Sequence, residues 1–145
     1  MSDITSTAVN ETQTVTAPDR GEIIVLNRDL FFGVKIGNIL RGLGYRVAFV
    51  PTTDSFVERL RTGDPSLVLG IIDMGTGVEW PTITGVTGDS GPKIPILAFG
   101  SHLDVEGRRA AKAAGVTRIL SNGDFHRDMV PLVDRYARKP DGQTP

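Results

Sequence analysis

Hydrophobic positions along this chain follow two different periods in alternation. Five apolar runs are too short for helices and rich in β-branched residues, so they predict strands that are buried on both faces. These runs cover residues 22–27, 45–50, 66–72, 94–99 and 117–121. Between them, apolar residues recur at helical spacing, and the chain is therefore predicted to alternate between strands and helices.

The first two helical segments carry clear start and stop signals. Apolar residues between 32 and 43 form an amphipathic pattern that is closed by glycines. Ser55 and Glu58 have the spacing of a capping box, which predicts the start of a second helix that ends near Gly63.

The later helical segments are more irregular. Glycines and prolines between residues 75 and 93 leave room for at most a short helix, near residues 80–86. Residues 104–114 and 124–138 predict two further helices, and Pro131 should kink the second of these or mark a break after its first turn.

Strands that alternate with helices through short connections predict parallel right-handed crossovers. The fold expected is a flavodoxin-like, doubly wound, five-stranded parallel sheet of order 2-1-3-4-5, with helices on both faces. In such a sheet ligands and chemistry lie beyond the carboxyl ends of the strands. The positions to examine there are Asn27, Arg28, Asp29, Asp73, Gly100, Ser101, His102 and Asn122.

Composition narrows the class of protein. The 145 residues are 39% hydrophobic, which suits one globular domain, and 16 basic against 17 acidic residues argue against nucleic acid as the main partner. There is no cysteine, and no apolar run reaches the ~20 residues of a membrane span. The polar segments 1–20 and 140–145 predict disordered tails around a folded domain at 21–139. We expect a cytoplasmic protein that does not contact membranes.

Four stretches of the chain resemble the receiver domain of bacterial two-component response regulators. They are "EIIVLNRD", "DPSLVLGIID", "IPILAFGSH" and "AAGVTRILSNGDF", and they look like the first, third, fourth and fifth strands of that family with their flanks. The resemblance implies a signalling domain in which an acidic pair holds magnesium and an aspartate accepts a phosphoryl group. A hydroxyl residue and a Lys-Pro pair complete that family's site.

This sequence departs from the family's pattern at most of those positions. Asn27 and Arg28 stand where the acidic pair belongs, Gly100 where the hydroxyl belongs, and Asn122 where the lysine belongs. Ser101 could replace the hydroxyl if the register slips by one. Asp73 is the one familiar residue.

Asp73 itself fits the family's acceptor position only with an adjustment of the third strand. Counted from Pro65, the acceptor position falls at Ile71, two residues before Asp73. A bulge at Gly70 could absorb the difference.

These departures predict a degenerate pseudo-receiver. A magnesium ion would have at most one good ligand, so no cofactor is expected, and magnesium only if the pocket is still active. Arg28 is expected to take the place of the ion and pair with Asp73. Two plainer alternatives stay open, in which Asp73 caps the turn at Gly75 to Gly77 and Arg28 is an ordinary solvated side chain.

Three functions remain possible from the sequence. The first is a stand-alone, non-enzymatic signalling module that acts without phosphorylation, since no effector domain follows residue 139. The second is a single-domain regulator phosphorylated at Asp73, and the third is a small-molecule binder on the same fold. The resemblance implies that a kinase, an effector or a second copy docks on the face of helix 4, strand 5 and helix 5, where the basic residues are Arg108, Arg109, Lys112 and Arg118.

Overall fold

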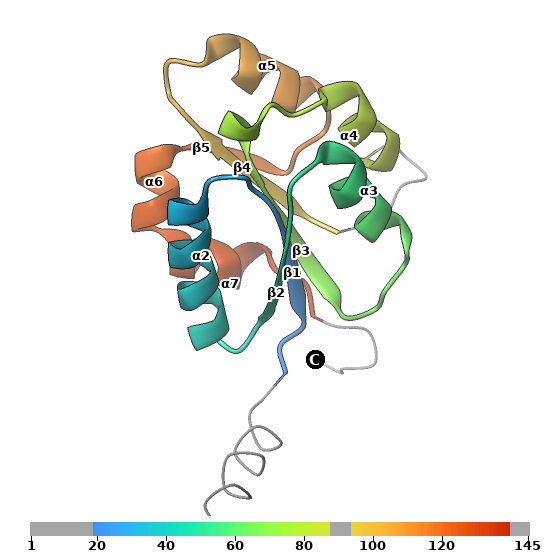
Figure 1. The fold of residues 1–145 in the computed structure, drawn as a ribbon, viewed down its shortest axis with the longest axis vertical. Coiled ribbons are helices and arrows are strands. Elements are labelled where there is room, and N and C mark those ends of the chain that lie inside the picture. Colours follow the sequence, from blue (N-terminus) through green and yellow to red (C-terminus); the bar gives the residue numbers. More distant parts are fainter. Residues whose placement is uncertain (1–18, 88–93, 140–145) are drawn as a thin grey trace, which may run out of the picture.

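The predicted sheet is present in the computed structural model, which describes residues 19–87 and 94–139 (Figure 1). Five parallel strands lie in the order β2-β1-β3-β4-β5, as the sequence predicts. They are β1 (Glu22–Leu26), β2 (Arg46–Val50), β3 (Leu67–Asp73), β4 (Ile96–Gly100) and β5 (Arg118–Ser121).

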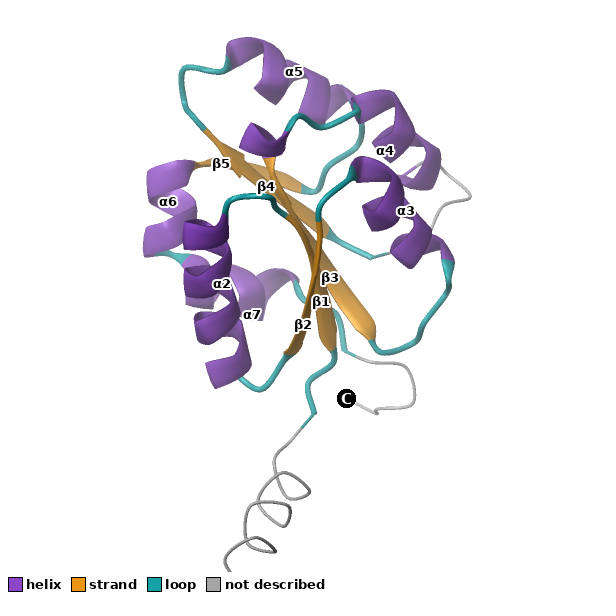
Figure 2. Cartoon of the chain, viewed as in Figure 1, coloured by secondary structure: helices purple, strands orange, loops and turns teal. Residues whose placement is uncertain are grey.

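Helices cover both faces of this sheet (Figure 2). One face carries α2 (Leu30–Gly42), α6 (Asn122–Arg127) and α7 (Met129–Tyr136). The other carries α3 (Thr53–Arg61), α4 (Trp80–Thr87) and α5 (Val105–Ala113). No helix in the described part of the chain is long and apolar enough to cross a membrane.

Side chains of each strand alternate between two hydrophobic cores. In β1, Ile23 and Val25 pack against the α2 side, and Ile24 and Leu26 pack against the α3 side. All seven residues of β3 are buried, because helices cover both of its faces. The continuous hydrophobicity of the strands follows from this burial.

Two helical details differ from the sequence prediction. The capping box is formed by Thr52 and Ser55 rather than by Ser55 and Glu58, since the Thr52 hydroxyl accepts the Ser55 N–H at 3.1 Å. The last helix breaks into α6 and α7 at Asp128, whose backbone leaves the helical region. Pro131 then lies in the first turn of α7, where backbone N–H groups have no partner within the helix, so the missing N–H of proline costs no hydrogen bond.

The predicted short third helix is confirmed as α4, which follows a 3-10 turn, η1 (Met74–Thr76). Residues 88–93 and most of the predicted tails lie outside the described residues.

At the start of the described chain, the Arg20 guanidinium donates to the Leu43 carbonyl at 3.1 Å and pairs with Asp134 at 3.2 Å.

Candidate functional site

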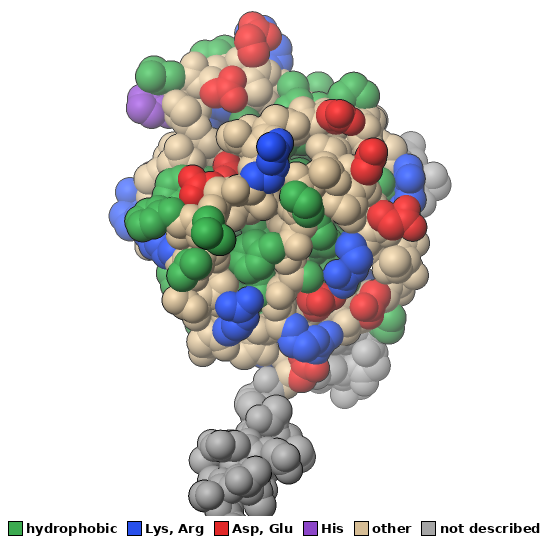
Figure 3. All heavy atoms as spheres, viewed as in Figure 1, with side chains coloured by type: hydrophobic (Ala, Val, Ile, Leu, Met, Phe, Trp, Pro, Cys, Tyr) green, Lys and Arg blue, Asp and Glu red, His purple; other side chains and the backbone are tan. Residues whose placement is uncertain are grey.

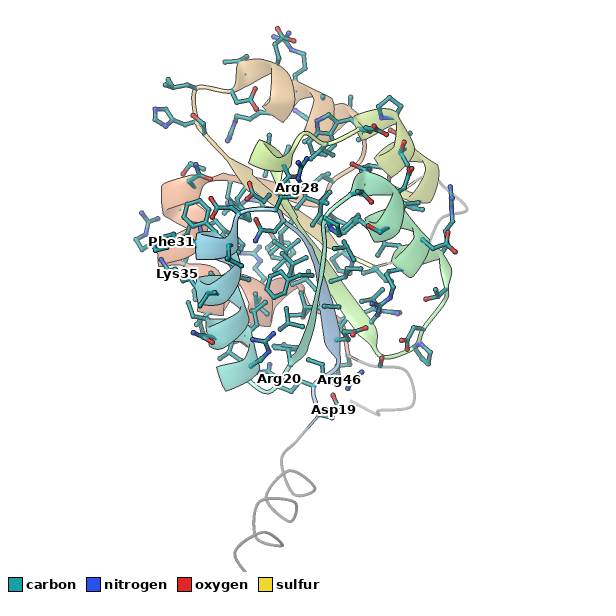
Figure 4. The ribbon with its side chains drawn as sticks, in the orientation of Figure 1. Asp19, Arg20, Arg28, Phe31, Lys35 and Arg46 are labelled. Carbon is teal, nitrogen blue, oxygen red and sulfur yellow. The ribbon has the colours of Figure 1, made fainter. Side chains whose placement is uncertain are left out.

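A pocket of about 550 Å³ lies at the carboxyl edge of the sheet, where the sequence places the candidate residues. Loops after β1, β3, β4 and β5 meet there, and Figure 4 shows Arg28 at this edge. The lining residues are Arg28, Asp29, Phe32, Asp73, Gly75, Thr76, Gly100, Ser101 and Asn122. Of the positions that the sequence places at this edge, Asn27 and His102 do not line the pocket.

Asn27 instead shapes the turn that leaves β1. Its side chain is buried, Nδ2 donates to the Asp29 carbonyl, and Oδ1 accepts the Asp29 N–H, each at 2.9 Å. An amide can make both bonds at once, because it offers a donor and an acceptor together. A carboxylate has no donor for the Asp29 carbonyl, so the replacement at this position is a structural one.

Asp29 begins α2 as its N-cap. The Oδ1 atom accepts the Phe31 N–H at 2.9 Å and the Phe32 N–H at 3.2 Å. A carboxylate at this position satisfies two free N–H groups and is favoured by the helix dipole.

Asp73 ends β3 and holds the turn that follows. The side chain is 6% exposed, and Oδ1 accepts the Gly75 N–H at 2.9 Å. The Thr76 hydroxyl donates to the Asp73 carbonyl at 2.8 Å, which closes the 3-10 turn. The capping interpretation of Asp73 is therefore confirmed, and the second carboxylate oxygen has no hydrogen-bond partner within the described part of the chain.

The bulge that brings Asp73 to this position is not at Gly70. Pairing between β1 and β3 shifts between Glu22 and Ile23, which pair with Leu67 and Leu69 and leave Val68 as the extra residue. Gly70 has a regular partner in Ile24. The predicted site of the bulge is therefore wrong, because the irregularity falls where β3 begins and leaves the buried ladder intact.

Burial raises the pKa of the Asp73 carboxyl above its ordinary value. The Gly75 N–H bond opposes this shift, and the negative charge of Asp29 across the pocket adds to it. Desolvation disfavours the charged form of a carboxyl, and a neighbouring carboxylate does the same. Among the described residues, no cation contributes to the shift of the Asp73 pKa.

The predicted ion pair between Arg28 and Asp73 is wrong. Arg28 is exposed, and its Nη1 donates a long bond of 3.5 Å to the Thr76 carbonyl. Within residues 19–87 and 94–139 the two side chains form no ion pair. An exposed guanidinium would have to leave water to reach a carboxylate that already has a backbone donor, so the pairing offers little gain.

Met74 explains why glycine stands at the hydroxyl position. A Cβ atom on Gly100 would lie 3.0 Å from the Cβ of Met74 and 3.3 Å from its sulfur. The Met74 side chain is almost fully buried and belongs to the α3-side core. Space that a hydroxyl side chain would need at position 100 is therefore filled by the methionine.

Ser101 and Asn122 lie where a turn and a helix begin. The Ser101 hydroxyl accepts the Leu103 N–H at 3.1 Å, which holds the turn before α5. Asn122 is the first residue of α6, whose N-cap, Ser121, accepts the Asp124 N–H at 3.1 Å. Ser101 lines the pocket, as it must if it replaces the family's hydroxyl residue one position later. Its hydroxyl, however, is bonded to the Leu103 N–H in the turn.

The donor set suits magnesium poorly. Magnesium prefers oxygen ligands, mainly carboxylates and water. The pocket offers two carboxylates, from Asp29 and Asp73, and Oδ1 of each is already bonded to backbone N–H groups. Arg28, a permanent cation, lines the same pocket. Among the described residues, no group of three or more His, Cys, Asp or Glu side chains could hold a metal ion.

His126 is a residue that sequence reasoning missed. Its ring lies 4.6 Å from the Phe32 ring and 5.3 Å from both the Phe99 and Phe125 rings, between centroids. Both ring nitrogens are buried without a hydrogen-bond partner in the described residues. Desolvation lowers the pKa of His126, and Lys35 lowers it further. The available signal was its place two residues after the expected helix start at Asp124 and next to Phe125.

The predicted basic surface is spread over several environments. Arg109 pairs with Glu106 at 3.4 Å, Arg118 donates to the Tyr136 hydroxyl at 3.2 Å, and Lys112 is exposed. Arg108 is half-buried, and its Nη1 has no hydrogen-bond partner in the described part of the chain. Three of the four residues therefore remain available on the surface.

No family model matches this sequence, and no curated protein matches it. Several solved structures, however, are similar to this chain in their three-dimensional fold. The signal receiver domain of an HD domain-containing protein from Pseudomonas fluorescens has a TM-score of 0.69 at 14% identity, over 83% of this chain and 89% of that one.

Two further structures give the same result. The receiver domain of a sensor histidine kinase from Pseudomonas aeruginosa, with magnesium coordinated in its active site cleft, has a TM-score of 0.67 at 19% identity over 80% of this chain and 96% of that one. Chemotaxis protein CheY4 of Vibrio cholerae has a TM-score of 0.65 at 17% identity over 80% and 98% of the two chains. This chain has the fold of the response regulator receiver domains.

Proposed function

We propose that this protein is a receiver-like signalling module that acts through protein contacts, without catalysis and without phosphorylation of Asp73. The receiver fold supports the signalling part of the proposal. The absence of phosphorylation is supported by the structural hydrogen bonds that Asp29, Asp73 and Ser101 already make.

Met74 over Gly100 is the observation that carries the proposal. Phosphoryl transfer depends on positioned cations and hydrogen-bond donors around the transferred oxygens. Here a thioether fills the space of the hydroxyl, an asparagine stands at the lysine position, and the carboxylate nearest the acceptor serves as a helix cap. The methionine is packed in a core and Asp29 caps α2, so neither group is free to position a phosphoryl group or a metal.

Partners are proposed to dock on the face of α5, β5 and α7. Arg109, Lys112 and Arg118 expose positive charge there, which favours an acidic surface on a kinase or an effector. A second copy of this chain is the alternative occupant of the same face.

Exposure to acetyl phosphate with magnesium tests the proposal. We expect no gain of one phosphoryl mass by intact-mass spectrometry, and the same result for Asp73→Asn as a matched control. A receiver domain with a complete acidic pair serves as the positive control. Labelling that is lost in Asp73→Asn would contradict the proposal.

Phosphorylation of Asp73 is the second candidate function, and one observation favours it. Asp73 lines the pocket, and the second oxygen of its carboxylate has no hydrogen-bond partner in the described residues. The mass experiment distinguishes the two candidates directly.

A further inference from the structure

A hydrophobic groove lies along α2, on the side next to the edge strand β2. We call it the α2–β2 groove and define it by Leu30, Val34 and Phe49, which are 82%, 56% and 37% exposed. The hollow has a volume of about 310 Å³, and its lining includes Gly33 as well as these three residues. Figure 3 shows hydrophobic side chains gathered over this part of the surface.

Two glycines create the hollow. A Cβ atom on Gly33 would lie 3.8 Å from the Phe49 ring, and one on Gly37 would lie 3.4 Å from it. Because neither glycine has a side chain, the Phe49 ring lies against the backbone of α2 and forms the floor. Leu30 and Val34, one helical turn apart, form the wall.

Basic groups stand at the two ends of the α2–β2 groove. Arg28 precedes α2 and Arg41 lies in its last turn, and both line the hollow. The Arg41 guanidinium reaches back along α2 to Gly37, where a Cβ atom would lie 2.8 Å from its Nη1, so the stretch of chain from position 28 to that cation is roughly 14 Å at 1.5 Å per residue. Asp29 also lines the hollow, but its Oδ1 accepts the Phe31 and Phe32 N–H groups.

We propose that this groove binds an amphipathic helix of a partner protein that carries apolar residues one turn apart and acidic residues at its two ends. An exposed apolar strip between two cations fits a helix of about three turns, whose apolar residues at positions i and i+4 would contact the strip. The surface lies beside β2, at the opposite edge of the sheet from β5, so the inference goes beyond the proposed function and does not depend on it.

A second copy of this chain is a poorer occupant. A symmetric contact through the groove would place Arg28 and Arg41 of each copy against the same residues of the other, and like charges repel. Other exposed large hydrophobic residues in the described chain are few, and Leu103 and Val105 belong to the α5 region, which carries Arg108, Arg109 and Lys112. Val105 on α5 is flanked by Asp104 and Glu106, and Val130 is exposed on α7, but neither helix exposes two large apolar residues one turn apart, so neither of these described helices matches the proposed occupant.

Selection from a displayed library of random 14-residue helical peptides tests the proposal on the full chain. We expect binders with apolar residues at i and i+4 and with Asp or Glu near both ends. Val34→Glu should weaken their binding by about tenfold or more. Leu103→Glu, which changes an exposed hydrophobic residue outside the groove, should leave binding unchanged. Arg41→Glu should weaken acidic peptides and strengthen variants in which the peptide's acids are lysines.

Several results would overturn the proposal. Binders that tolerate Val34→Glu, binders enriched in Lys or Arg, or repeated selections without any binder would each do so. Sedimentation that shows a dimer abolished by Val34→Glu would assign the groove to a second copy instead. The unfolding temperature of the Val34→Glu variant is the stability control. If it is close to that of the parent protein, the loss of binding comes from the changed surface and not from unfolding.

Discussion

The middle of strand β3 and its carboxyl end differ in what surrounds each residue. In the middle, Leu69 and Ile71 pack against one core and Ile72 against the other, and the neighbours are hydrophobic side chains on both faces. At the end, Asp73 and Gly75 are joined by a 2.9 Å hydrogen bond within the same turn. Tertiary packing fixes the middle, whereas local hydrogen bonds fix the end.

This difference indicates where the receiver scaffold can change without loss of the fold. A substitution in the middle disturbs the close-packed core that the side chain faces, so the scaffold tolerates few residues there. A substitution at the end of a strand changes only a turn. Asn27 can therefore stand in place of an acidic residue, because its amide bonds to the backbone of Asp29. Gly100 can stand in place of a hydroxyl residue, because Met74 lies in the adjoining space.

The largest expected effect is at Gly70, in the middle of β3. A Cβ atom there would lie 2.8 Å from Cζ of Phe56, which is fully buried. Gly70→Val should therefore destabilise the protein by about 2 to 4 kcal/mol, measured by urea unfolding. Gly42→Ala is the matched control, because nothing lies within 4 Å of its added Cβ, and it should be neutral or slightly stabilising. Equal effects at the two glycines would contradict the comparison.

An intermediate effect is expected where a strand end meets the core. Gly100→Ser should cost about 1 to 2 kcal/mol, because its Cβ would press on Met74. Met74→Ala keeps the Cβ contact but removes those with the sulfur and the terminal methyl group, so the double variant should be less destabilised than the sum of the two single variants by about 0.5 to 1 kcal/mol. Gly123→Ser, with nothing within 4 Å, is the control. Additive effects in the cycle would show that Met74 does not block a hydroxyl at position 100.

Asp73→Asn should stabilise the protein at pH 7 by about 1 kcal/mol, because the amide can still accept the Gly75 N–H without burying a charge. The folded state raises the pKa of Asp73 above its ordinary value of 3.8. Protonation therefore favours folding, and this contribution is fully present below pH 3.8 and is lost as the pH rises through the folded pKa. The advantage of asparagine should accordingly vanish in unfolding measurements made below pH 3.8. A difference between the variants that is independent of pH would contradict this account.

The smallest effect is expected at Arg28. Its guanidinium is exposed and makes one long bond to a carbonyl, so Arg28→Ala should change the free energy of unfolding by less than about 0.5 kcal/mol. The change should be additive with Asp73→Asn, since the two side chains do not pair. A coupling energy above about 1 kcal/mol in that cycle would restore the ion pair that the sequence suggested.

The sequence by itself determined the strands, the helices and their order in the sheet. Each depends on which residues are apolar and how they are spaced, and burial on two faces imposes that pattern on β1, β3 and β4 directly. The prediction that candidate residues gather at the carboxyl edge of the sheet succeeded for the same reason, because parallel topology brings the ends of all five strands to one edge.

Only the tertiary structure decided what each of those residues does. The position of Arg28 away from Asp73 depends on a choice between water and a buried carboxylate, which a sequence does not display. The contacts of Met74 with Gly100 and of His126 with the Phe32 and Phe99 rings join segments far apart in the chain. Such contacts depend on distances of a few tenths of an ångström within a packed interior, and residue type and spacing do not specify distances on that scale.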